Sequence, residues 1–208
     1  MASDSGLIRL GLIGLGSWAR RAYLPVLQEL ANVRVEAVAA RTEGTRQAAR
    51  GLLGGDIDLY GDYSDLLSHA QVDAVMIALP PAVSAQATTT ALEAGKHVWV
   101  EPPFPDDRDA NRFLDLAEQT ATVFHVDLQL RYLPVVDALR EAVARGELGR
   151  LLQVRVEFET NWARRRPITD QRYVGSPMFG LAPWYVDLMN TFLEGSPERL
   201  DVFGSFPR

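Results

Sequence analysis

Residues 7–126 alternate between short apolar runs and longer segments in which apolar residues recur every three or four positions. The short runs are rich in Val, Ile and Leu, which is typical of strands buried on both faces of a sheet. The longer segments are typical of amphipathic helices that cover such a sheet. Strands are predicted at residues 7–13, 33–40, 57–60, 73–79, 97–100 and 122–126, and helices at 17–30, 42–53, 83–94 and 106–120. This α/β alternation predicts a doubly wound parallel sheet.

The pattern changes after about residue 127. Helical periodicity is found at residues 133–145 and 183–193, whereas residues 151–160 alternate with a period of two and residues 199–204 form a short last strand. We therefore predict an α/β domain over residues 1–126 and an α+β domain with an open sheet over residues 127–208. Open sheet faces and edges need a cover. We expect this sheet to pair with a second copy of the chain or with a larger partner subunit.

The first strand leads through a glycine turn directly into a helix. Gly14, Gly16 and Ala19 stand in the three positions of the dinucleotide-binding fingerprint. Gly14 permits the tight turn, Gly16 lets a pyrophosphate approach the backbone, and Ala19 keeps the helix close to the strand. The helix N-terminus, with Ser17 and Trp18, then faces the phosphates. The pattern predicts a Rossmann domain that binds NAD or NADP.

The residues after the second strand indicate which dinucleotide is preferred. A carboxylate there would bind the ribose hydroxyls of NAD, but this chain has Arg41 and Thr42, which suit a 2′-phosphate. We expect NADP rather than NAD, with a site that has lost its cofactor as the alternative. Leu79 and Pro80 are expected beside the nicotinamide, and Glu101 completes the predicted cofactor-binding set.

Composition excludes several other classes of function. Apolar residues make up 47% and charged residues 23% of the 208 residues, as in ordinary globular proteins. The net charge of −6 argues against a nucleic-acid surface. The chain has no cysteine, and its three histidines are too scattered to predict a metal site. We expect no membrane span and a cytoplasmic location, because the apolar runs are only as long as strands.

Four segments carry a resemblance to a known family: residues 11–19 (GLIGLGSWA), 72–81 (VDAVMIALPP), 91–101 (ALEAGKHVWVE) and 146–149 (GELG). In these the sequence resembles the glucose-fructose oxidoreductase, inositol dehydrogenase and rhizopine catabolism (Gfo/Idh/MocA) oxidoreductases. The resemblance implies an N-terminal Rossmann domain, a C-terminal α/β domain that this chain carries in shortened form, and a small-molecule substrate.

The same resemblance implies two proton-transfer residues that this sequence lacks. The family's lysine follows a glutamate after the fifth strand, where this chain has Pro102 after Glu101. The family's histidine precedes an aspartate that aligns with Asp187, which places Trp184 at the histidine position. Neither residue can transfer a proton at neutral pH. Asp187, Tyr185 and Glu101 remain as weak catalytic candidates.

Two functional hypotheses follow from these departures. The first is a cofactor-binding or partner-binding subunit without the usual dehydrogenase activity. The alternative is an NADPH-dependent reductase of an imine or iminium, because a cationic iminium accepts hydride without a proton from the protein. A third alternative is a degenerate relic of such an enzyme or an incomplete chain.

Overall fold

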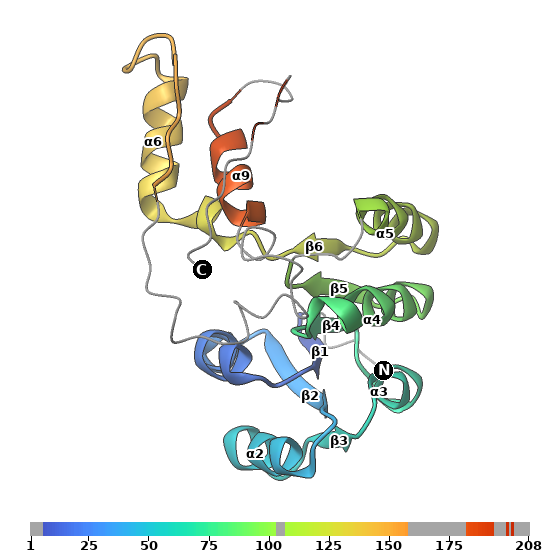
Figure 1. The fold of residues 1–208 in the computed structure, drawn as a ribbon. Helices are drawn as coiled ribbons and strands as arrows, with labels where there is room; N and C mark the ends of the chain where they lie inside the picture. Colours follow the sequence, from blue (N-terminus) through green and yellow to red (C-terminus); the bar gives the residue numbers. More distant parts are fainter. Residues whose placement is uncertain (1–5, 103–106, 158–181, 194–198, 200, 202–208) are drawn as a thin grey trace, which may run out of the picture. The chain divides into compact units, whose positions relative to one another are not determined.

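The computed structural model describes residues 6–102, 107–157, 182–193, 199 and 201. These residues belong to two compact units, of which one ends its main segment at Asp127 and the other begins at Leu128 (Figure 1). No helix within the described ranges is long and apolar enough to cross a membrane.

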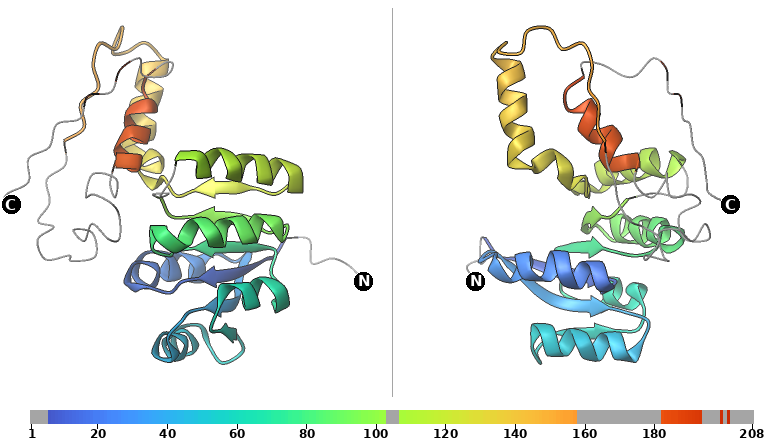
Figure 2. Two further views of the ribbon diagram at one scale, coloured as in Figure 1. Left: turned by 45° about the vertical axis from the view of Figure 1, so that its right-hand side comes forward. Right: turned by 60° about the vertical axis from the view of Figure 1, so that its left-hand side comes forward.

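The first unit is built on six parallel strands in the order β3-β2-β1-β4-β5-β6 (Figures 1 and 2). The strands are β1 (Ile8–Ile13), β2 (Val33–Ala39), β3 (Asp58–Tyr60), β4 (Ala74–Ile77), β5 (His97–Val100) and β6 (Phe124–Val126). This order confirms the predicted doubly wound sheet. Successive strands run outward from β1 on one side and from β4 on the other, so the order reverses between β1 and β4. A crevice at the carboxyl ends of these two strands is where such folds bind ligands.

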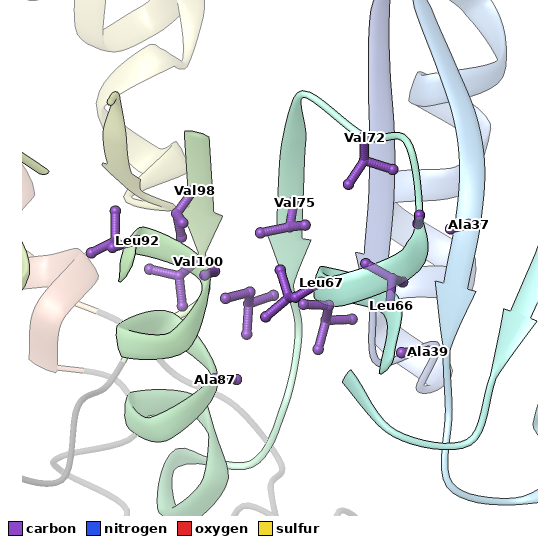
Figure 3. Packing of buried hydrophobic residues seen from close by; sticks show 14 of the residues in the cluster. Ala37, Ala39, Leu66, Leu67, Val72, Val75, Ala87, Leu92, Val98 and Val100 are labelled. Atoms are coloured by element: carbon purple, nitrogen blue, oxygen red, sulfur yellow. The ribbon is translucent and has the colours of Figure 1, made fainter. Parts of the chain in front are cut away.

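Helices cover both faces of the sheet (Figure 2). They are α1 (Leu24–Glu29), α2 (Glu43–Leu53), α3 (Tyr63–His69), α4 (Pro81–Glu93) and α5 (Asp107–Thr120), with a π-helix, η1 (Ala19–Tyr23), before α1. Buried residues alternate between the faces, since Ala37 and Ala39 pack with α3, α4 and α5 whereas Val38 packs with α1 and α2. Figure 3 shows the first of these clusters, with Leu66 and Leu92 among its members. The sheet is thus a rigid frame for the loops at its edges.

The predicted helix at residues 17–30 contains a π turn that the hydrophobic pattern does not reveal. Helical backbone begins at residue 17 and runs to Glu29, and the amide of Leu24 donates to the carbonyl of Ala19, five residues earlier. The cause is Pro25, which has no amide hydrogen and whose ring would collide with the carbonyl four residues back in a regular helix. A wider turn just before the proline relieves this conflict.

The second unit contains a 3₁₀ helix, η2 (Gln129–Tyr132), and the helices α6 (Pro134–Ala144) and α9 (Ala182–Asn190). Both helices were predicted. The strand predicted at residues 151–160 is wrong over residues 151–157, which have no regular structure. Alternation creates a strand only where a neighbouring strand can pair with it, and none is present among the described residues of this unit. Residues 158–160, and most of the strand predicted at 199–204, lie outside the described residues, so the expectation of a partner on that sheet stays a prediction.

Candidate functional site

The glycine turn after β1 lies at the point where the strand order reverses. Gly14 has a φ of +92°, and a Cβ on it would lie 2.4 Å from the carbonyl oxygen of Ala78. Only glycine fits such a position. A Cβ on Gly16 would meet no heavy atom of the described residues within 4 Å. The turn therefore packs tightly against β4 at Gly14 and leaves open space beside Gly16, as a backbone that accepts a pyrophosphate requires.

The helix after this turn is held against the sheet by Ala19, which is buried in the cluster beneath α1 and α2. The carbonyl of Gly16 accepts a hydrogen bond from the amide of Arg20 at 3.1 Å. Ser17 and Trp18 are both exposed beside the turn. Leu79 reaches the turn from β4, since its Cδ2 atom would lie 2.9 Å from a Cβ on Gly14. Pro80 is the N-cap of α4.

The end of β2 carries no carboxylate. Ala40 is followed by Arg41 and by Thr42, which caps α2 by accepting a hydrogen bond from the Thr45 amide at 3.3 Å. Arg46 donates to the carbonyl of Ala40 at 2.6 Å and pairs with Glu43. No acidic side chain in the described part of the chain pairs with the exposed Arg41. This end of the strand is thus cationic, which suits a 2′-phosphate.

Two carboxyl groups follow directly after neighbouring strands at the same edge of the sheet. Glu101 comes after the last residue of β5, and its amide donates to the carbonyl of Ile77 in β4 at 3.1 Å. Asp127 comes after the last residue of β6, and its amide donates to the carbonyl of Val100 in β5 at 2.9 Å. Asp127 is only 6% exposed. Each carboxyl group shifts the pKa of the other, so the two groups lie near one another.

Two aromatic donors connect this carboxyl pair to the helix after the glycine turn. The indole Nε1 of Trp18 lies 2.8 Å from Glu101 Oε1 and 2.8 Å from the hydroxyl of Tyr23. That hydroxyl donates to Asp127 Oδ2 at 3.1 Å. Trp99 of β5 holds the ring of Tyr23 edge-to-face, with centroids 4.7 Å apart. The π turn at residues 19–23 places Trp18 and Tyr23 where both can reach the pair.

The surroundings of the pair favour its protonated form. Burial raises the pKa of Glu101 to about 8, with a further rise from the charge of Asp127, while the bond from Trp18 opposes the shift. Burial also raises the pKa of Asp127 to about 6, opposed by the charge of His125 and by the bond to Glu101. Between these values the pair holds one proton and one negative charge.

The sequence analysis placed Glu101 in the cofactor-binding set and among the weak catalytic candidates, but it missed the pairing with Asp127 and the aromatic donors. One signal could have found the pair, because each carboxylate immediately follows a predicted strand and the two strands are neighbours. Pro102 is buried directly after Glu101, and it supplies no proton at the position where the resemblance implies a lysine.

The remaining candidates lie in the second unit, and Asp187 and Trp184 contact η2. Asp187 is buried and forms a bidentate ion pair with Arg131, whose Nε lies 2.8 Å from Asp187 Oδ2. The indole of Trp184 donates to the side-chain oxygen of Gln129. Burial raises the pKa of Tyr185. The contacts of Asp187 and Trp184 hold α9 against η2, so these two side chains have a structural role.

Lysine and histidine side chains also make local structural contacts. Lys96, the single lysine of the sequence, donates to the carbonyl of Val72 at 2.9 Å. His97 Nδ1 accepts from the amide of Val123, and His69 Nδ1 contacts the carbonyl of Asp65. Among the described residues, no group of three His, Asp or Glu side chains is placed to hold a metal ion.

Comparison with known proteins identifies both parts of the chain. Residues 8–128 match the model of an oxidoreductase family with an NAD-binding Rossmann fold, and residues 136–208 match the GFO/IDH/MocA C-terminal domain. The chain is 31% identical over 169 residues to dTDP-3,4-didehydro-2,6-dideoxy-alpha-D-glucose 3-reductase of Saccharopolyspora spinosa. That match covers 80% of this chain and 49% of the reductase, so the chain spans about half the length of this relative.

Two solved structures share the fold at similar identity. A 3-ketoreductase from Actinomadura kijaniata in complex with NADP and TDP-benzene has a TM-score of 0.62 and 28% identity, over 67% of this chain and 43% of that one. Scyllo-inositol dehydrogenase from Lactobacillus casei with NAD(H) and scyllo-inositol has a TM-score of 0.64 and 25% identity, over 69% and 42%. Together with the matched family models, these likenesses show that the chain belongs to the Gfo/Idh/MocA family of NAD(P)-binding oxidoreductases.

Proposed function

We propose that this chain binds NADP(H) at the turn after β1 and supports hydride transfer between the nicotinamide and a small polar substrate. The observation that carries the proposal is the glycine turn. Gly14 cannot be replaced without a collision, whereas a Cβ on Gly16 would meet no heavy atom of the described residues within 4 Å. Both glycines lie where the strand order reverses. Family membership supports the same chemistry.

The described residues divide the work of holding the dinucleotide. The amides from Leu15 to Ala19 suit the pyrophosphate, whereas the amide of Gly14 already donates to the carbonyl of Ala39. Arg41 and Thr42 suit the 2′-phosphate, and Leu79 and Pro80 border the nicotinamide side. A bound dinucleotide supplies or accepts the hydride. The relatives act on a nucleotide-linked keto sugar and on scyllo-inositol, so we propose a polyol or keto sugar as the substrate class.

Calorimetric titration with NADPH and NADH tests the choice of cofactor. We expect NADPH to bind more tightly, and Arg41→Asp to reverse that preference because a carboxylate repels the 2′-phosphate and accepts ribose hydroxyls. Arg50→Ala is the matched control, since this arginine lies in the last turn of α2. If the parent chain and Arg41→Asp bind NADPH with equal affinity, Arg41 does not take part in binding the 2′-phosphate.

The second candidate is a subunit that binds the cofactor without catalysing dehydrogenation. Pro102 in place of the family's lysine and the bond from Trp184 to Gln129 favour it. Turnover assays with inositols, keto sugars and preformed iminium salts separate the candidates. Binding without turnover of any substrate supports the subunit, whereas turnover of iminium salts alone supports a reductase that needs no proton donor.

A further inference from the structure

We propose that Glu101 and Asp127 act as one proton-sharing pair, and that Glu101 is the residue that delivers this proton to the substrate oxygen. This inference rests on the proposed function, because it needs a hydride donor at the neighbouring turn. It assigns the role that the family resemblance gives to a lysine to the residue immediately before Pro102.

The position of the pair is fixed by backbone hydrogen bonds. The amide of Glu101 donates to β4 and the amide of Asp127 donates to β5. Both side chains therefore lie at the carboxyl ends of adjacent strands. Such an edge is where ligands bind in doubly wound sheets. Trp18 stands two positions after Gly16, and its indole donates to Glu101 at 2.8 Å. A side chain of the cofactor-binding turn therefore contacts the proposed proton donor directly.

One aromatic side chain donates a hydrogen bond to each carboxyl group of the pair. Trp18 donates to one oxygen of Glu101, and Tyr23 donates to one oxygen of Asp127. The charge of Asp127 raises the pKa of Glu101, so the two carboxyl groups are near enough to share a proton. Two ionised carboxylates in this place would repel each other in a poorly solvated site. A single proton shared by the pair removes that repulsion.

The groups that face the pair come from three elements. Trp18 and Tyr23 lie at the start of the helix after β1, and Trp99 packs behind Tyr23 from β5. His125 in β6 acts on Asp127 through its charge. No arginine or lysine among the described residues contributes to the shifts of either carboxyl group. Within the described ranges, His125 is thus the one positively charged side chain that acts on the pair.

The proposed step is balanced. As the carbonyl carbon of the substrate receives hydride from the reduced nicotinamide, the carbonyl oxygen forms a bond to the proton of Glu101. The O–H bond of Glu101 breaks, and its electron pair stays on the carboxylate. The substrate is reduced to an alcohol and the nicotinamide is oxidised. Solvent then returns a proton to the pair. In the reverse direction the Glu101 carboxylate accepts the proton of the alcohol.

Infrared titration of the ligand-free chain tests the shared proton without any turnover. We expect a carbonyl band of a protonated carboxylic acid that titrates with a midpoint near 8 and that Glu101→Gln removes. Asp127→Asn should lower the midpoint because it deletes a like charge. Trp18→Phe should raise it because it deletes a bond that favours the ionised form. Glu29→Gln, at the exposed end of α1, should change nothing. Absence of the band at neutral pH, or its survival in Glu101→Gln, would overturn the inference.

Kinetics test the delivery of the proton. With NADPH and the small ketone diacetyl as probe, we expect the rate to fall as pH rises through the infrared midpoint. At saturating NADPH, Glu101→Gln should slow it by at least about 100-fold, the low end of general-acid contributions. A preformed iminium salt should escape this loss, because it needs no proton. Failure of NADPH to bind refutes the proposed function. Binding of NADPH without reduction of diacetyl counts against both the hydride transfer and the role of Glu101. Equal rates of reduction in both chains refute the role of Glu101 alone.

Discussion

The two glycines of the turn after β1 are expected to respond oppositely to alanine. In Gly14→Ala, a φ of +92° costs a residue with a Cβ about 1–2 kcal/mol. The new Cβ would also lie 2.4 Å from the Ala78 carbonyl oxygen, and relieving such an overlap in a packed site costs about 1–3 kcal/mol. The free energy of unfolding should therefore fall by about 2–5 kcal/mol, a large fraction of the total in a protein of ordinary stability.

Gly16→Ala is the matched variant. Its Cβ meets no heavy atom of the described residues within 4 Å and its φ is not in the left-handed region. Replacing glycine there should leave stability unchanged or raise it by up to about 1 kcal/mol, because the unfolded chain loses freedom. The same methyl group would intrude on a pyrophosphate. An overlap of about 1–3 kcal/mol corresponds to about a 5- to 150-fold loss of NADPH affinity.

Urea unfolding followed by tryptophan fluorescence, together with NADPH titration of each variant, measures both effects. The expected pattern is a large loss of stability in Gly14→Ala and a loss of binding with intact stability in Gly16→Ala. The reasoning is refuted if Gly14→Ala unfolds within about 0.5 kcal/mol of the parent chain, the range of an ordinary surface substitution. It is equally refuted if Gly16→Ala binds NADPH as the parent chain does.

Three further predictions concern pH, the second unit and the π turn. Burial raises the pKa of Glu101 from 4.5 to about 8, so the folded chain binds more protons than the unfolded chain in that interval. The free energy of unfolding should fall as pH rises through it, and urea curves of Glu101→Gln should show a smaller fall; parallel profiles would contradict this. Arg131→Met leaves the Asp187 carboxylate buried without its partner, which costs about 3–5 kcal/mol in a fully buried pair and less here because Arg131 is 43% exposed. Faster amide exchange across α9 is the expected sign, and unchanged exchange would refute it. Pro25→Ala restores an amide donor and should return residues 19–23 to a regular α-helix, a change that backbone chemical shifts report and that persistent π-helical shifts would disprove.

The architecture was predictable because its signals are local. The strands β1, β2, β4 and β5 lie inside the sheet between two layers of helices, so each is a short apolar run. Such a run predicts a strand without reference to the rest of the chain. The order of a parallel sheet then follows from the handedness of its crossovers. The glycine turn was equally predictable, since a tight backbone turn requires glycine at particular positions. Gly14 meets that requirement in the structure.

What escaped prediction depends on distant neighbours. Trp18 and Glu101 are separated by 83 positions, and Tyr23 and Asp127 by 104, so nothing in either local sequence reveals their hydrogen bonds. The π turn required the collision between Pro25 and the helix before it to be weighed against the hydrophobic pattern. The strand predicted over residues 151–157 is wrong for a related reason. The alternation of apolar and polar residues indicates which side chains would face a core, but a strand also needs a neighbouring strand to form its hydrogen bonds.

The contrast between Asp187 and Glu101 shows why residue type alone could not assign their roles. Both are carboxylic acids with restricted access to solvent. Asp187 meets a guanidinium that donates two hydrogen bonds, and this arrangement gives the side chain a fixed structural partner. Glu101 meets another carboxyl group, a tyrosine-linked network and an indole donor, and burial raises its pKa. A group held protonated beside a cofactor turn is suited to give that proton away, whereas one locked to arginine is not. The environment therefore selects Glu101, which the sequence ranked no higher than Asp187.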